Sequence, residues 1–276
     1  MNCNATIAAM RTSVALVILL FALLAPVDAA EHPALAKARA LYNAGNLDEA
    51  IASATTARSD PASADAAALV IGRAHLERYR QRTDPADLAA AQEALSAVRV
   101  AALLPRDQID LQVGLGQALY LGEVYGAAAE LFDSALSAAA LLPARDRLLL
   151  LDWWATALDR DAQRRPADRR GAVFARVLAR MEDEVRQDPG SAPANYWLAA
   201  AARGSGDLDR AWHAAIAGWI RAGLRPETAA ALRADLDRLV TEALTTERAR
   251  TRPAREQAEA LTALRAEWES IKQQWK

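Results

Sequence analysis

The chain has 276 residues, of which 33 are basic and 35 acidic, so its net charge is −2. This near balance excludes the global basic field that recruits nucleic acid or an anionic membrane, and we expect no nucleic-acid partner. Alanine and leucine dominate the composition while aromatic residues make up 5%, which favours closely packed helices over a β-sandwich.

The first segment has the pattern of a secretory signal peptide. Arg11 precedes an apolar run over residues 14–25, a proline follows the run, and small residues come next. The run has 12 residues, fewer than the ~20 that a membrane-spanning helix needs. We therefore predict a signal peptide over residues 1–29 that is cleaved after Ala29 or Ala30; an uncleaved anchor is the alternative.

Removal of this segment would leave an exported chain without cysteine, because Cys3 is the single Cys of the sequence. Such a chain cannot form a disulfide scaffold, a thiolate zinc site or a cysteine nucleophile. Cys3 also precedes the apolar run, whereas the lipid-bearing cysteine of a lipoprotein follows it. We expect no transmembrane segment in the mature chain and, if the source is Gram-negative, a periplasmic location.

The remaining chain carries a pattern with a period of about forty residues. Three stretches align on Ala50, Ala128 and Ala211, which are 78 and 83 residues apart, close to two periods each. Gly45 and Gly206 lie at predicted turns ahead of the first and third of these alanines, where helices commonly end in a left-handed residue. Each repeat is therefore predicted to be two antiparallel helices with small residues at their closest approach.

The pattern predicts twelve helices in six pairs, with prolines marking the breaks between pairs. The pairs fill the chain after the signal segment without a long structureless loop, which supports the assignment. The predicted helices span residues 33–44, 47–59, 63–81, 85–103, 106–122, 124–140, 144–163, 166–187, 191–204, 207–222, 226–249 and 253–275.

The repeated residues resemble the tetratricopeptide repeat family. The resemblance implies an all-α fold, an α-solenoid of about six antiparallel helix pairs in a TPR-like superhelix, with the repeats over residues 30–225. It also implies a concave groove lined by the first helix of each pair, the surface on which some family members bind peptides. The residues of the best-matching stretch are Leu115, Gly116, Tyr125, Ala128, Phe132 and Ala135.

The last predicted pair, residues 226–276, departs from the repeat and is expected to cap the array. Its second helix carries an apolar stripe with spacings of three and four residues, opposite a face of mixed charge. The alternatives to a cap are docking onto a partner, self-association through this helix, and a membrane-surface helix. The stripe consists of Leu261, Leu264, Trp268, Ile271 and Trp275.

Motifs that would indicate catalysis or a bound cofactor are missing from the sequence. The three His are far apart, and no pair has metal-ligand spacing. The acidic run 182–184 is expected to be a solvated surface, and the basic run 164–170 either the same or a site for phosphate or an acidic partner. We therefore predict no catalytic residues, no metal, no cofactor and no enzymatic activity.

The candidate binding site is the predicted concave groove, where Arg and Tyr, which are enriched at binding hot spots, recur. Adjacent Trp153 and Trp154 diverge by about 100° on a helix, and we assign Trp154 to the groove. The alternative is that Arg is simply abundant and that some Tyr belong to the core. Because five of the side chains are Arg on a nearly neutral chain, we expect an extended acidic or carboxylate-bearing ligand. The predicted groove residues are Arg39, Tyr42, Asn43, Arg73, Arg80, Gln117, Tyr120, Trp154, Arg164, Tyr196 and Arg203.

These observations predict a non-enzymatic, exported protein-interaction scaffold or adaptor that binds a protein or peptide in its groove. The expected setting is a cell-envelope assembly, secretion or transport system. The alternative is a small-molecule-binding accessory protein with an apolar pocket inside the helical array. A deep pocket lined by Leu and Trp would favour the alternative, whereas an open groove would favour peptide binding.

Overall fold

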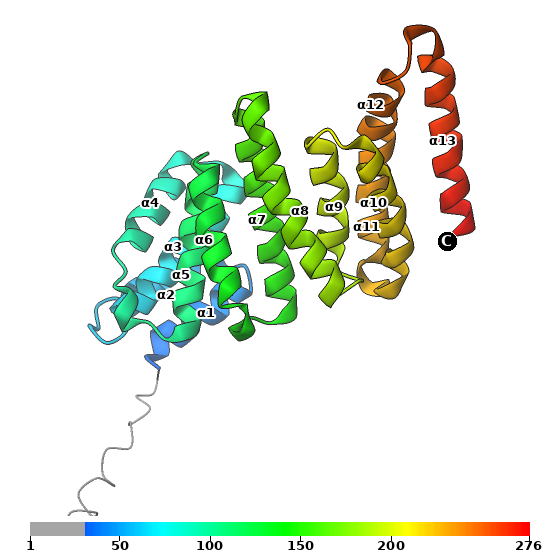
Figure 1. The fold of residues 1–276 in the computed structure, drawn as a ribbon. Coiled ribbons are helices and arrows are strands. Elements are labelled where there is room, and N and C mark those ends of the chain that lie inside the picture. Colours follow the sequence, from blue (N-terminus) through cyan, green and yellow to red (C-terminus); the bar gives the residue numbers. More distant parts are fainter. Residues whose placement is uncertain (1–30) are drawn as a thin grey trace, which may run out of the picture.

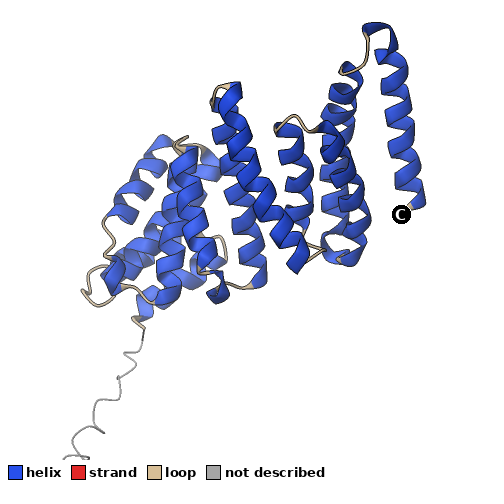
Figure 2. Cartoon of the chain, viewed as in Figure 1, coloured by secondary structure: helices blue, strands red, loops and turns tan. Residues whose placement is uncertain are grey.

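The computed structural model describes residues 31–276, and within this range every regular element is a helix (Figure 2). The all-α class expected from the composition is confirmed. The predicted signal peptide, residues 1–29, lies outside the described residues. Across residues 31–276 the helices are either too short or too polar to traverse a bilayer.

Helices α1–α6 form a group at one end of the molecule, and α7–α13 follow in chain order toward the other end (Figure 1). Helices adjacent in sequence pack against each other. Helix α11 continues through a π-helical turn, Val240–Leu244, into α12, so that the two form one rod. The helices are α1 (Pro33–Asn43), α2 (Leu47–Ala57), α3 (Ala64–Arg82), α4 (Pro85–Ser96), α5 (Pro105–Leu121), α6 (Tyr125–Ser137), α7 (Ala144–Arg164), α8 (Ala167–Gln187), α9 (Ala192–Gly204), α10 (Leu208–Arg221), α11 (Pro226–Leu239), α12 (Thr245–Arg250) and α13 (Gln257–Gln274).

Three predicted helices differ from the observed ones by more than two residues at one end. The helix predicted over 85–103 ends at Ser96, and the one predicted over 124–140 ends at Ser137. Helix α13 starts at Gln257, four residues later than expected. In each case a short 3-10 turn occupies the difference, and its apolar or helix-favouring residues extend the sequence pattern beyond the α-helix.

Three connections between helices share one short motif, Ala, then Ala or Gly, then Leu, one further residue and Pro. The motif occupies residues 101–105, 139–143 and 222–226, and each copy overlaps a 3-10 turn that precedes an odd-numbered helix. Its proline lies at or just before the first helical residue, where a missing N–H is tolerated and φ is already suitable. The spacings of 38 and 83 residues match one and two periods of the sequence pattern.

The predicted tight turns are present. Gly45 and Gly206 adopt φ of 78° and 86°, in the left-handed region that glycine tolerates. After the second turn, the side chain of Asp207 accepts a 3.0 Å hydrogen bond from the backbone N–H of Arg210 and caps α10. These turns reverse the chain between α1 and α2 and between α9 and α10.

Small residues permit the close approach of paired helices, as expected. A β-carbon at Gly116 of α5 would lie 2.5 Å from the Phe132 ring of α6, and one at Gly72 of α3 would lie 2.5 Å from Leu95 of α4. Such contacts leave no room for a methyl group. One large cluster of buried side chains extends from α5 to α13, and two smaller clusters hold α1–α5 together.

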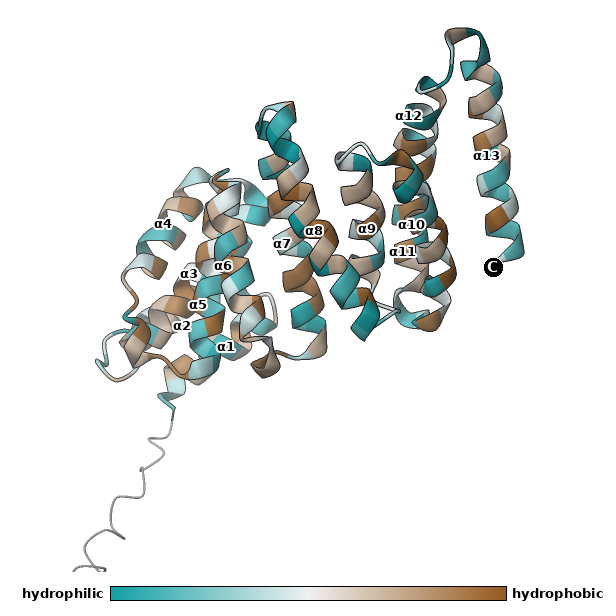
Figure 3. Ribbon diagram, viewed as in Figure 1, coloured by the Kyte–Doolittle hydropathy of each residue, from teal (hydrophilic) through white to brown (hydrophobic). Residues whose placement is uncertain are grey.

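Helix α13 packs its apolar stripe against the end of the helical array. Trp268 is fully buried, and its ring centre lies 6.1 Å from that of Trp212 and 5.4 Å from that of Trp219. The Trp268 indole N–H also donates to Asp237 of α11 at 2.8 Å. Figure 3 shows the alternation of hydrophobic and hydrophilic residues along this helix. The side chain of Trp275, at the end of the stripe, is 47% exposed, although its backbone carbonyl accepts hydrogen bonds from Trp219 of α10 at 3.0 Å and Arg233 of α11 at 3.2 Å.

Candidate functional site

Two cavities lie on the surface formed by α1, α3, α5, α7, α9 and α11, which we call the odd-helix face. The first cavity has a volume of about 640 Å³ and is lined by α1, α3, α5, α7 and the residue Leu142 that precedes α7. The second has a volume of about 890 Å³ and is lined by α7, α9 and α11, with Arg225 at the start of α11. No residue of an even-numbered helix lines either cavity. The exposed Leu149 of α7 belongs to both, so the cavities are neighbours along one face.

The charges of the first cavity are paired within the protein. Arg39 of α1 donates to Asp107 of α5 at 2.8 Å, and Arg73 of α3 donates to Asp110 of α5 at 2.9 Å. Both aspartates project from α5, and they neutralise the arginines of the two preceding odd-numbered helices. The first cavity is therefore a charge-balanced surface, and its ion pairs tie three odd-numbered helices together.

Arg80 and Trp153 form one wall of the first cavity, with two tyrosines behind Trp153. The Arg80 guanidinium lies 5.6 Å from the ring centre of Trp153, in the range of a cation–π contact. Tyr120 packs edge-on against Trp153 with ring centres 5.1 Å apart, and against Tyr125 at the same distance. Arg80 forms its ion pair with Glu77, one turn away on the same helix. This wall offers aromatic area together with a half-exposed cation.

The second cavity has a predominantly apolar wall. Leu148 and Leu149 come from α7, Tyr196 and Trp197 from α9, and Leu232 from α11. Such a wall, with a few polar groups in it, is typical of sites that bind small molecules or apolar side chains. The cavity is open to solvent along the odd-helix face and has the form of a groove.

Four carboxylates line the second cavity, and three of them, Asp152, Asp159 and Asp235, we call the acidic centre; the fourth is Glu227, in the first turn of α11. Asp152 and Asp159 are seven residues apart and so share one face of α7, while Asp235 projects from α11. Among residues 31–276, neither Asp152 nor Asp159 forms an ion pair, and Asp235 pairs with Arg238 at 3.4 Å.

The environment of the acidic centre raises the pKa of its groups. Burial raises the pKa of Asp152, the charge of Asp235 adds to this, and a 2.8 Å hydrogen bond from the Trp197 indole opposes it. Burial likewise raises the pKa of Asp159. The pKa of the Tyr196 hydroxyl is raised by burial and by the charges of all three carboxylates. Asp159 is half-buried, whereas Asp152 and Asp235 are exposed, and the charges of Arg160 and Arg203 partly offset the effect of burial on Asp159.

The structure brings most of the predicted groove residues onto the odd-helix face. Tyr196 lines the second cavity, and Tyr120 lies behind the first against Trp153. Six predicted residues line the first cavity, namely Arg39, Tyr42, Asn43, Arg73, Arg80 and Gln117.

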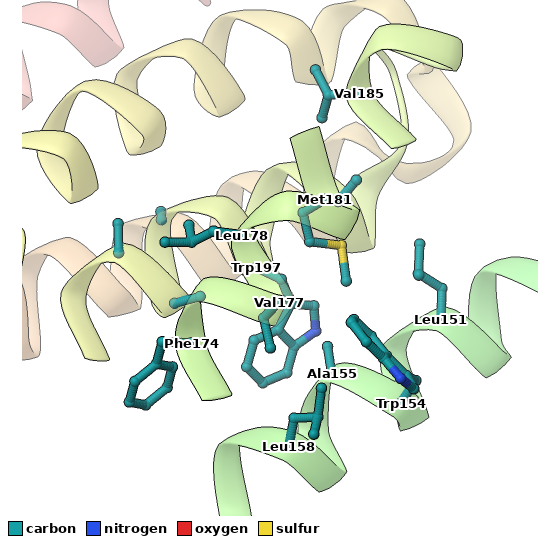
Figure 4. Close-up of a cluster of buried hydrophobic side chains, with 14 of the residues drawn as sticks. Leu151, Trp154, Ala155, Leu158, Phe174, Val177, Leu178, Met181, Val185 and Trp197 are labelled. Atoms are coloured by element: carbon teal, nitrogen blue, oxygen red, sulfur yellow. The ribbon is translucent and has the colours of Figure 1, made fainter. Parts of the chain in front are cut away.

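Trp154, Arg164 and Arg203 are not available in the groove. Trp154 is 1% exposed and lies in the buried cluster with Leu151 and Met181, as Figure 4 shows, so its assignment to the groove is wrong. Arg164 forms an ion pair with Glu123 at the turn between α5 and α6. Arg203 is held by both carboxylate oxygens of Glu247, at 2.8 and 2.6 Å.

All five arginines of the predicted groove have a carboxylate partner in the chain. The partners are Asp107, Asp110, Glu77, Glu123 and Glu247. The track of uncompensated positive charge that motivated an acidic ligand is therefore not formed by these five arginines. In the second cavity the carboxylates of the acidic centre lie on the same face as Arg145 and Arg160, which form no ion pair within residues 31–276.

The groove residues that sequence reasoning missed lie mainly on α7. If the outward-facing side of α7 is shifted by one residue, Trp153 takes the place of Trp154 in the groove. The same side of the helix then carries Arg145, Leu149, Asp152 and Thr156, which follow one another at spacings of three and four residues. One residue is about 100° on a helix, which moves a side chain from the surface into the core. The spacing was a usable signal, but the two adjacent tryptophans left it ambiguous.

Among residues 31–276, no group of three or more His, Cys, Asp or Glu side chains is arranged to hold a metal ion. Comparison with protein-family models, with curated proteins and with solved structures gives no match.

Proposed function

We propose that the protein is an exported, non-enzymatic scaffold or adaptor that binds a segment of another protein along the odd-helix face. In this proposal the helix pairs form a TPR-like α-solenoid of about six units, capped by α13, and the setting is a cell-envelope assembly, secretion or transport system. The signal-peptide pattern of residues 1–29 supports export, and the repeated spacing of alanines supports the repeat.

One observation carries the binding proposal. Two cavities of about 640 and 890 Å³ are lined by odd-numbered helices and the residues just before α7 and α11, and they share Leu149. Successive units thus contribute to one continuous track, which suits an extended or helical segment better than a compact ligand. Because the arginines of the first cavity are paired internally, the proposal does not require an acidic segment.

Site-specific photocrosslinking in the native host tests this proposal. A photoreactive residue replaces Leu149, between the two cavities, or Asn43, at the far wall of the first cavity. The control position is Ala179, exposed on α8 and outside both cavities. We expect one protein to be crosslinked from both groove positions and not from Ala179. Equal crosslinking from all three positions, or none from the groove, would reject the proposal.

The second cavity favours one alternative function, the binding of a small apolar molecule. Its volume of about 890 Å³ and its leucine and tryptophan wall fall within the range of known small-molecule sites. Native mass spectrometry of the purified full chain distinguishes the two. A co-purified compound of fixed mass that is lost in Leu232→Arg would establish the alternative, whereas a protein of unaltered mass would count against it.

A further inference from the structure

We infer that the second cavity receives a basic side chain, Lys or Arg, of an otherwise apolar peptide segment. This inference rests on the proposed function and specifies the chemistry of the ligand at one part of the odd-helix face. It follows from the combination of an apolar groove with negative charge at one end of it.

The distribution of charge in the cavity has a direction. Arg145 lies in the first turn of α7 and Arg225 at the start of α11, so both line the end where these helices begin. Arg225 is held by Asp188 at 2.8 Å, and Glu227 of the first turn of α11 also lines this end, 3.9 Å from Arg225, so the charges here are balanced. Asp152 and Asp159 follow about two and four turns later on α7. Two cations are near them: the exposed Arg160, and Arg203, which is itself paired with Glu247. The cavity therefore becomes acidic away from the helix starts.

Tyr196 marks the centre of this acidic end. It lies on α9, which packs against both α7, the helix of Asp152 and Asp159, and α11, the helix of Asp235. The charges of these carboxylates raise the pKa of its hydroxyl, and the charge of Arg203 opposes them. A cation placed beside this hydroxyl would face three carboxylates from two helices. The cation would take the place of water around the carboxylates. The Tyr196 ring offers aromatic surface next to the cation.

The shape of the wall selects the kind of cation. A Lys or Arg side chain carries its charge on an aliphatic stem, which buries well against apolar surface while the head reaches polar groups. Leu148, Leu149 and Leu232 provide that apolar surface, and each precedes an aspartate of the acidic centre by three or four residues on the same helix. A segment with apolar residues on either side of a basic residue would cover these leucines and deliver the charge to the carboxylates.

Binding of synthetic peptides to the full chain tests the inference. The peptides are short, acetylated and amidated, with a background of leucine and alanine and one central residue that is Lys, norleucine or Glu. Norleucine keeps the stem of Lys and lacks the charge. We expect the Lys peptide to bind about tenfold tighter than the norleucine peptide at low salt, and the Glu peptide to bind weakest.

Matched variants locate the effect. In a double variant with Asp152→Asn and Asp159→Asn, the preference for Lys over norleucine should fall to less than about threefold. Asp161→Asn is the control, because Asp161 lies on the same helix but lines neither cavity of the odd-helix face and pairs with Arg165. It should keep the full preference. Circular dichroism establishes that all variants are folded.

The outcomes separate the inference from the proposed function. Equal binding of the Lys and norleucine peptides, or a preference that survives in the double variant, overturns the inference alone. Failure of every peptide to bind also overturns it, and the crosslinking at Leu149 then decides whether the proposed function stands.

Discussion

At the scale of single residues, the buried carboxylate of Asp87 shows how charge is accommodated in the helix pairs. It is 2% exposed, and it accepts hydrogen bonds from His75 at 2.8 Å and from Arg78. Burial would raise the pKa of Asp87, but the bonds from Arg78 and His75 outweigh burial and hold it below its ordinary value of 3.8. The ionised form therefore stabilises the fold above that pH, and the stabilisation is lost as the pH falls through the lowered pKa.

We accordingly expect Asp87→Asn to lower the free energy of unfolding by about 1–3 kcal/mol at pH 7. The difference from the unsubstituted protein should shrink as the pH falls below 3.8, because the carboxyl of the unfolded chain then takes up a proton more readily than the native one. Urea unfolding at several pH values measures both effects. Glu93→Gln, at an exposed position of the same helix, should change little. A loss that does not depend on pH would show that the charge of Asp87 is not the cause.

The pKa of Asp152 is shifted in the opposite direction from that of Asp87. Its raised pKa means that the ionised form destabilises the fold, a penalty that is absent below pH 3.8 and appears as the pH rises through the raised pKa. Since solvent reaches this carboxylate, we expect Asp152→Asn to stabilise the protein at pH 7 by no more than about 1 kcal/mol. Differential scanning calorimetry should show a higher Tm at pH 7 and no difference at pH 3. A lower Tm at pH 7 would mean that the carboxylate is compensated after all.

At the scale of elements, the glycines distinguish close helix packing from an open helical surface. Gly116 faces Phe132 with no room for a β-carbon, whereas Gly171 in α8 has no atom near its missing β-carbon. We expect Gly116→Ala to destabilise the protein by about 1–3 kcal/mol through overpacking. Gly171→Ala should instead stabilise it by about 0.5–1 kcal/mol, because alanine favours helix more than glycine. Chemical denaturation measures both; equal effects at the two sites would contradict the packing.

The same elements show what can and cannot be predicted from the sequence. Helix positions follow from apolar periodicity and from prolines, which are local signals, so most predicted ends are close to the observed ones. The site depends on which residue of a helix faces outward, and on α7 two adjacent tryptophans make a one-residue shift of register equally plausible. The carboxylates that pair with the groove arginines also cannot be identified from neighbouring residues, since Arg39 and its partner Asp107 are 68 residues apart in the sequence.

At the scale of the whole molecule, α7–α13 follow one another in chain order, and most helix contacts join near neighbours along the chain. In such an array stability is close to a sum of terms from each unit and each interface, and local damage stays local. Trp268 of α13 tests this, because it is fully buried against Trp212 and Trp219 at one end of the array.

We expect Trp268→Ala to cost about 3–5 kcal/mol in the opening of the helices around it. Amide hydrogen exchange should show lost protection in α10–α13, since these helices surround the vacated site, while amides of α3–α5 keep their protection. Trp275→Ala is the control on the same helix: this side chain is 47% exposed, and its removal should leave protection unchanged throughout. If Trp268→Ala lowers protection equally in α3–α5 and in α10–α13, the chain unfolds as one cooperative domain and the additive array is rejected. A loss confined to the C-terminal helices would support both the array and the role of α13 as its cap.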